Sequence, residues 1–335
     1  MAPNGSAAQA SAFHAVIDAG NKFDGNPNDM WKFYILNNSQ PVGYIPEEFM
    51  AQISWKDTDF IVKQKTKSVI LSPAFRTDMT AVEACQHQFR KFCEVNRAQF
   101  NGCLDKWLLS KNPSYQAIRW LDHREPMFTI PTPLRGIFGI ATAGVHLNVY
   151  TTINQKPFMW VSYRSLTASY PGMMDQIVAG GMDPEDGYEA WKTLEHEAWE
   201  EAGLVLDRNS YEMTHKGVKV GTVQGPSRIS FYDQKGIHVG VAEQGHIEPG
   251  VRFVFDLEVS PDFTPTPGGD KHVGSFRLKP MDEVKEDLLG GKWKPNSALT
   301  TLDFLLRKGY VADDDNGEVK KLRARLQVEL PMETS

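Results

Sequence analysis

The sequence predicts an α/β protein in which helices cover both faces of a mixed sheet. Alternating apolar residues in the second half of the chain predict strands, among them 136–152, 158–164 and 251–259. A helical segment at 183–203 is bounded by glycines, and two more helical segments follow residue 280. Since each helix must bury its apolar stripe against the sheet, these helices predict an α/β/α sandwich.

The first part of the chain predicts a smaller α+β domain at 13–130, in front of this sheet. Residues 1–12 are rich in Ala, Ser and Gly and are expected to be disordered. The domain is expected to contain a strand at 31–38, a short helix at 46–53, a strand or hairpin at 60–74 and a helix at 80–97. No catalytic constellation is visible there, so we expect it to frame the substrate or to dimerise. The proline-rich segment 126–133 predicts a linker.

The second domain is expected to span 131–312. Its expected strands are two within 136–152, joined near Thr142, and others at 158–164, 175–181, 251–259 and 275–280, with a long hairpin at 211–241. Residues 313–335 predict a charged tail with one helix.

Three glutamates share one face of the helix at 183–203. Glu197, Glu200 and Glu201 stand at i, i+3 and i+4, so their carboxylates converge. Converging carboxylates raise each other's pKa unless a cation lies among them. Oxygen ligands of this kind suit Mg²⁺ or Mn²⁺ and not zinc. The alternative is a solvated acidic face of the helix.

The segment GGMDPEDGYEAWKTLEHEAWEEAGL (180–204) resembles the Nudix box. The second half of the pattern is matched in full, by Glu197, Ala198, Glu200, Glu201, Gly203 and Leu204. Two positions depart from the pattern. His196 stands where the box has an arginine, and Tyr188 where it has its first glutamate. Three nearby acids could replace that glutamate: Glu185, Asp186 and Glu189.

The flanking segments resemble one Nudix subfamily, which is related to thiamine pyrophosphokinase-associated proteins of fungi and plants and has an added N-terminal domain. They are LRGIFGIATAGVHLNVYT (134–151), MWVSYRSLTASYPGMMDQIVAGG (159–181), VRFVFDLEV (251–259) and KPNSALTTLDFLLRKGYV (294–311). This resemblance implies an enzyme that hydrolyses a small organic diphosphate, with a thiamine-type diphosphate favoured, to the monophosphate and phosphate.

The resemblance also implies roles for individual residues. The metal, Mg²⁺ or Mn²⁺, is expected on Glu197, Glu200 and Glu201, and His196 is expected to orient their helix. Gly180 and Gly181 are expected to let the phosphates approach the backbone, and Arg164 and Tyr170 to lie near the substrate. His272 stands where the subfamily is expected to have an acidic base. The candidate bases are therefore His272, Asp270, Glu243 and Glu248.

Three other functions compete with this interpretation. One is an enzyme repurposed for another diphosphate, such as a prenyl diphosphate in fungal secondary metabolism. The second is a non-hydrolytic enzyme that uses the same metal site. The third is a binding protein with a diverged box, since a fold alone does not determine function.

The composition indicates which partners the protein can bind and in which compartment it is expected. The net charge of −6 gives no support for nucleic-acid binding. The sequence contains no run of about 18 apolar residues, so no membrane span is predicted. The three cysteines, with no CxxC pair, argue against a disulfide framework and for a reducing compartment. No secretory signal is visible, so we expect a cytoplasmic protein that acts on a small molecule as a monomer or homodimer.

Overall fold

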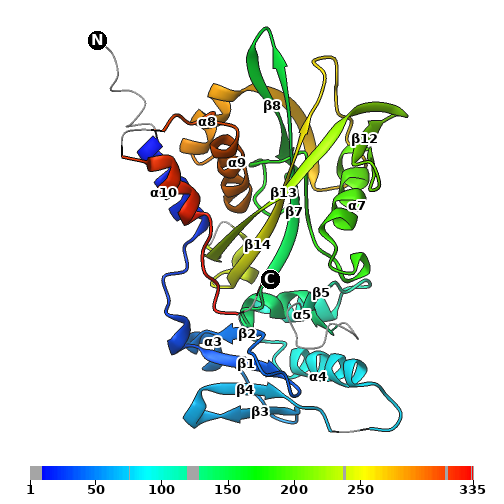
Figure 1. The fold of residues 1–335 in the computed structure, drawn as a ribbon. Coiled ribbons are helices and arrows are strands. Elements are labelled where there is room, and N and C mark those ends of the chain that lie inside the picture. The colour runs from blue at the N-terminus through cyan, green and yellow to red at the C-terminus, as the bar shows by residue number, and fades with distance from the viewer. Residues whose placement is uncertain are drawn as a thin grey trace.

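The structure is a computed structural model that describes residues 10–74, 76–118, 128–236, 239–313, 316–332 and 334. A large sheet with helices on both sides forms the upper part of the molecule in Figure 1, and a smaller sheet with its own helices forms the lower part. The large sheet contains both parallel and antiparallel pairs. The predicted α/β class with a mixed sheet is therefore confirmed.

The smaller unit is built on a four-stranded sheet. Its order is β2 (Gly43–Ile45), β1 (Trp31–Ile35), β4 (Ser68–Leu71) and β3 (Phe60–Lys63). Residues 60–71 therefore form a hairpin, one of the two predicted alternatives. The helices are α3 (Glu47–Met50), α4 (Ala81–Val95) and α5 (Cys103–Leu108). Thr80 and Glu83 form a reciprocal capping box at the start of α4. All three cysteines are buried and free.

The described part of the predicted linker, 128–133, is regular structure. Strand β6 (Phe128–Pro131) pairs with β5 (Tyr115–Ile118), and α6 (Thr132–Ile137) follows. Prolines are tolerated here because Pro133 lies in the first turn of α6, where no backbone N–H is needed. Leu134 and Ile137 pack in the core of the smaller unit. The linker prediction is therefore wrong over these residues, while 126 and 127 lie outside the described residues.

The large sheet has seven strands in line and two short ones beside them. The line is β11 (Leu204–Asp207), β12 (Glu212–His215), β13 (Val218–Gln234), β14 (Ile247–Glu258), β7 (Thr142–Ile153), β8 (Lys156–Arg164) and β15 (Val273–Pro280). β10 (Val178–Gly181) pairs with β7, and β9 (Met174–Asp175) with β8. Only β14 and β7 run parallel among these pairs.

The prediction of two strands within 136–152 is wrong. Gly139, with φ of 57°, lies in the turn after α6, and β7 then runs without interruption from Thr142. Gly144, two residues after the expected junction at Thr142, pairs with Gly181 on one side and Arg252 on the other. The missing side chain of Gly144 lets β10 approach, because an added Cβ would lie 2.7 Å from the carbonyl oxygen of Gly180.

Helices cover both faces of this sheet, as Figure 1 shows. α7 (Ala190–Ala202) lies on one face, and its Leu194, Ala198 and Ala202 are fully buried in one cluster with β7 and β14. α8 (Met281–Leu289) and α9 (Pro295–Arg307) lie on the other face, in a second cluster. The predicted α/β/α layering is confirmed. In the part of the chain that the structure describes, no helix is both long and apolar enough to cross a bilayer.

Two helices from opposite ends of the sequence lie together on the outer side of α9. α2 (His14–Gly20) packs there through Ile17, and α10 (Glu318–Arg325) covers it (Figure 1). His14 Nε2 lies 2.9 Å from the Glu318 carboxylate. The predicted tail helix is therefore present as α10. Residues 10–12, expected to be disordered, are helical, and 1–9 lie outside the described residues.

Candidate active site

The glutamate helix begins later than predicted and ends where predicted. A short 3-10 helix, η4 (Pro184–Asp186), follows β10, and α7 starts only at Ala190. Gly187 and Tyr188 have φ of 61° and 65°, which a right-handed helix cannot contain. At the other end Gly203 takes the left-handed conformation and its N–H bonds the Trp199 carbonyl at 3.1 Å.

Two of the three glutamates lie against β10. The Glu197 carboxyl group occupies the space that a side chain of Gly180 would fill, since an added Cβ would lie 1.8 Å from its carboxyl carbon. Glu201 accepts a hydrogen bond of 2.6 Å from the backbone N–H of Ala179. Gly180 is therefore needed for the approach of Glu197, a role that the sequence did not indicate.

Burial raises the pKa of both carboxyl groups. Burial raises the pKa of Glu197 to about 7, and repulsion from Asp183 and Glu200 adds to the effect. Burial and the neighbouring Glu197 raise the pKa of Glu201 well above its usual value, although the Ala179 N–H acts in the opposite direction. A cation between these groups would relieve both penalties.

Glu200 lies apart from the other two glutamates and contacts His196. His196 Nε2 lies 3.1 Å from Glu200 Oε1, and its Nδ1 lies 3.7 Å from Asp186 Oδ1. Burial alone would lower the pKa of His196, but the carboxylates of Glu200 and Asp186 outweigh it and raise that pKa. Asp186 is thus the acid that faces the histidine, whereas Glu189 pairs with Arg208. Within the described ranges, no three His, Cys, Asp or Glu side chains form a ready metal-binding group.

A cavity of about 450 Å³ opens beside Glu197 and Glu201, and we call it the charged pocket. Its acidic wall contains Glu197, Glu201 and Asp270 next to the backbone of Gly180 and Gly181. The rest of its lining, which we call the basic wall, contains Arg135, Arg164, Lys235, Arg252 and Lys294, together with the carboxylates Asp233, Glu243 and Glu248. Of the residues predicted from the sequence, Arg164, Tyr170, Gly180, Gly181, Glu197, Glu201 and His272 all line it.

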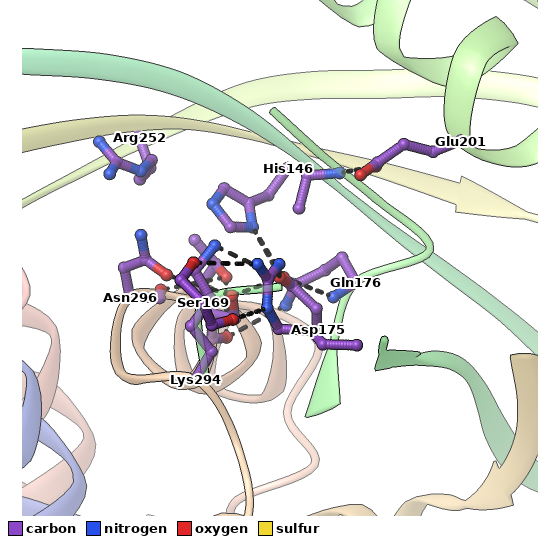
Figure 2. Close-up of polar contacts among 12 residues, drawn as sticks. His146, Ser169, Asp175, Gln176, Glu201, Arg252, Lys294 and Asn296 are labelled. Atoms are coloured by element: carbon purple, nitrogen blue, oxygen red, sulfur yellow. Dashed lines mark hydrogen bonds and ion pairs between the residues drawn. The ribbon is translucent and has the colours of Figure 1, made fainter. Parts of the chain in front are cut away.

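Asp175 holds two cations of the basic wall, and Figure 2 shows it beside one of them, Lys294. This buried carboxylate lies 3.0 Å from Arg164 Nη1 and 3.3 Å from Lys294 Nζ, and it accepts a hydrogen bond of 2.5 Å from Ser297. Burial would raise the pKa of Asp175, but Lys294, His146 and Arg164 together lower it. Two cations share one carboxylate here, so positive charge remains for an anion in the pocket.

Two of the four predicted bases are held by cations on the wall opposite Glu197. Glu248 lies 2.9 Å from Arg252 and 3.8 Å from Lys235, and Glu243 pairs with the same lysine. These cations outweigh burial and lower the pKa of both carboxyl groups. Carboxylates with lowered pKa values are weak proton acceptors.

The other two, Asp270 and His272, lie on the acidic side. Their loop is fixed to the end of α7, because the Gly268 N–H bonds the Glu201 carbonyl at 2.9 Å. Gly268 is required there, since an added Cβ would lie 2.2 Å from the Glu200 carbonyl oxygen. His272 Nδ1 lies 3.0 Å from Asp270 Oδ1. The structure therefore brings these two candidate bases into the pocket that contains Glu197.

The loop between β8 and β9 carries the aromatic side of the pocket. Arg164 Nε donates a hydrogen bond of 2.6 Å to the Ser169 carbonyl, and Tyr170 follows with φ of 54°. Tyr170 and Phe231 line the charged pocket. Arg164 thus links the loop that contains Tyr170 to Asp175.

Several residues that line the pocket, or that hold its lining residues in place, were not predicted as site residues. Arg252 interrupts the apolar strand segment VRFVFDLEV, and Asp175 stands in the segment that leads to β10. A charged residue within an apolar strand segment indicates a buried charge, and both residues are buried. Lys294 and Gln116 carry no local signal, because the fold brings them to the pocket from distant segments.

Replacement of His196 by arginine tests its pairing role. If His196 orients α7 through Asp186 and Glu200, and if the pocket hydrolyses a diphosphate, His196→Arg should preserve or raise the rate as the pH rises through the raised pKa of the histidine, because arginine keeps its proton there. His196→Ala should lower hydrolysis at every pH. The check is the pH profile of kcat/KM between pH 6 and 9, and an inactive arginine variant beside an active alanine variant would contradict the pairing role.

The fold and the pocket define a mixed α/β protein with buried carboxyl groups facing cations across one cavity. No protein-family model matches the chain. The chain is 32% identical to Nudix hydrolase 20, chloroplastic, of Arabidopsis thaliana over 57% of its own length and 46% of that protein. It is 31% identical to Nudix hydrolase 24, chloroplastic, of the same plant, over 57% and 47%. The chain is thus similar in sequence to two plant Nudix hydrolases over 57% of its length.

The chain also resembles one yeast protein and several solved structures. The uncharacterized protein YJR142W of Saccharomyces cerevisiae is 31% identical over 64% of this chain and 60% of that protein. The NUDIX domain of Shewanella oneidensis NrtR complexed with ADP ribose is 12% identical, with a TM-score of 0.32, over 46% of this chain and 84% of that chain. A C. elegans Ap4A hydrolase is 11% identical, with a TM-score of 0.33, over 49% and 98%. The matched regions span 46–60% of the three sequence relatives.

Proposed function

We propose that this protein hydrolyses a small organic diphosphate, with a thiamine-type diphosphate favoured, to the monophosphate and phosphate. One observation carries the proposal. The charged pocket is lined by the half-buried Glu197 and the buried Glu201, both with raised pKa values, and by two cations that share the carboxylate Asp175. A diphosphate with a divalent cation has the charges that complement both walls.

The acidic wall fits a hard divalent cation. In the part of the chain that the structure describes, Glu197 and Glu201 form no ion pair with a lysine or arginine, and burial raises the pKa of both. Such carboxyl groups are oxygen ligands suited to Mg²⁺ or Mn²⁺. We propose that Glu197, Glu200 and Glu201 hold the ion, which requires Glu200 to exchange its contact with His196 for the metal. When bound, such an ion neutralises charge on the phosphate oxygens.

The chain's own residues supply the remaining steps. Arg164 and Lys294 bind the phosphate oxygens from the basic wall. Asp270 accepts a hydrogen bond from the Nδ1–H group of His272, which leaves Nε2 unprotonated and able to take a proton from the attacking water. The water oxygen forms a bond to the terminal phosphorus, and the bond from that phosphorus to the bridging oxygen breaks. The products are the organic monophosphate and phosphate.

The preference for a thiamine-type substrate is supported by the resemblance of the flanking segments and by Tyr170, whose aromatic ring lines the pocket. We place the reaction in the cytosol, and the three buried free cysteines are consistent with a reducing compartment. We expect a monomer or homodimer with no nucleic-acid partner.

A phosphate-release screen tests the function. Purified protein is expected to release phosphate from a thiamine-type diphosphate with Mg²⁺ or Mn²⁺. EDTA should lower the rate at least about 100-fold, since a metal stabilises the transition state by several kcal/mol. The panel should include thiamine, oxythiamine, geranyl and adenosine diphosphates. Phosphate release from none of them, with the protein folded and the metal at millimolar concentration, would refute the proposed function.

A further inference from the structure

A second cavity, of about 630 Å³, lies beside the charged pocket. It is bounded by α2, by the loop that contains Tyr170, by the end of α8 and by the start of α9. Apolar side chains dominate its wall, among them Val16, Met173, Leu288, Trp293 and Ala298. Lys22 is the one charged side chain in the part of this wall that the structure describes. We call this cavity the apolar pocket.

The two cavities adjoin through a shared wall. Tyr170, Val239 and Pro295 line both of them. Pro295 directly follows Lys294, whose ammonium group faces Asp175 in the basic wall. A molecule whose phosphates contact Lys294 and Arg164 therefore has its next atoms at the border of the apolar pocket.

The wall contributed by α2 is fixed in place. Phe13 and Ile17 are buried in the same cluster as Leu299 of α9. Asp18 pairs with Arg325 of α10 on the outer side. The pocket-facing residues Ala15 and Ala19 stand one turn apart and are small, so they leave the cavity open. A preformed apolar cavity of this volume falls within the range, about 300–1,000 Å³, of small-molecule pockets.

We propose that the apolar pocket holds the organic group of the diphosphate substrate and that α2 sets the size of that group. The proposal rests on the proposed function, because it assigns the phosphates to the charged pocket. Burial of apolar area between Trp293, Met173 and α2 favours a bulky and largely apolar group over a small one. The substrate class is therefore a diphosphate ester of a bulky alcohol, and the segment before the smaller unit determines specificity.

A bulky residue on α2 tests this assignment. Ala19→Phe fills the apolar pocket from a position that contacts no group of the charged pocket. Ala324→Phe on α10 is the matched control, since Ala324 is exposed and lies outside both cavities. The substrates are methyl, thiamine and geranyl diphosphate, and the readout is kcat/KM with Mg²⁺.

The wild type should prefer thiamine or geranyl diphosphate to methyl diphosphate by about tenfold or more. Ala19→Phe should remove this preference, leave methyl diphosphate within about twofold of the wild type, and keep the melting temperature of the control. An unchanged preference in Ala19→Phe, or equal rates on all three substrates in the wild type, would overturn the inference and leave the proposed function standing.

If no diphosphate is hydrolysed, the proposed function is refuted. The assignment of the apolar pocket is then tested separately by measuring the binding of monophosphates. Isothermal titration of thiamine and geranyl monophosphate into the wild type and Ala19→Phe then decides on the pocket. Binding by the wild type that the variant loses supports the assignment of the apolar pocket. Absence of binding to the wild type, or equal binding to both proteins, overturns it.

Discussion

Glu201→Gln is expected to lower kcat by about 100-fold or more and to raise the melting temperature at neutral pH. The carboxylate is a proposed metal ligand, and loss of its charge weakens a contribution of several kcal/mol to the barrier. The amide oxygen can still accept the hydrogen bond from Ala179, so the fold retains this contact. The variant no longer has a buried acid whose pKa is raised by burial and by Glu197.

The gain in stability should depend on pH in a defined direction. Above its usual pKa of 4.5, Glu201 loses its proton in the unfolded chain but retains it in the folded protein. The folded state then binds more protons, so wild-type stability falls as the pH rises from 4.5 through the folded pKa. The advantage of Glu201→Gln should therefore be larger at pH 7.5 than at pH 5, in thermal melts without metal.

A second glutamate on the same helix provides the control. Glu195 is half-exposed, pairs with Arg208 at 2.8 Å and does not line the charged pocket. Glu195→Gln should leave kcat within about twofold and shift stability little, as for most exposed ion pairs. Wild-type rates in both Glu200→Gln and Glu201→Gln, at saturating Mg²⁺, would contradict the metal assignment.

The parts of the site that are local in sequence could be predicted from it. Glu197, Glu200 and Glu201 lie within one turn and a half, and Gly203 ends their helix through its own backbone conformation. The start of α7 was missed because Tyr188 adopts a positive φ that its residue type does not indicate. Its hydroxyl bonds the Ile118 carbonyl of the smaller unit, a contact that depends on the tertiary fold.

The parts that depend on distant contacts could not be predicted. Asp175 and Lys294 are 119 residues apart, and hydropathy along the chain does not show that they meet. The same holds for Glu197 and Gly180, whose fit depends on how α7 packs against β10. The segment that became α2 was assigned to the smaller unit because it precedes that unit in sequence. Periodicity indicates which face of an element is buried and leaves open which partner buries it.

Asp175→Asn is expected to destabilise the protein by about 3 kcal/mol and also to weaken diphosphate hydrolysis. Removal of the carboxylate leaves Arg164 and Lys294 without their counter-charge in a buried setting, which typically costs several kcal/mol. The pKa of Asp175 is lowered, so its stabilising contribution is complete at neutral pH and is lost only as the pH falls below about 3.8. The destabilisation should therefore be present in urea unfolding at pH 7.

The matched control is Asp287→Asn. Asp287 is also a buried carboxylate between two lysines, Lys279 and Lys292, but it lies on α8 and lines neither pocket. It should lower stability while leaving kcat/KM within about twofold, whereas Asp175→Asn should lower kcat/KM by about tenfold or more, chiefly through KM. This difference is expected because Asp175 orients Arg164 and Lys294, the two cations that we propose to bind the phosphates. Equal kcat/KM values in the two variants would show that this carboxylate supports the fold alone and that the phosphates bind elsewhere.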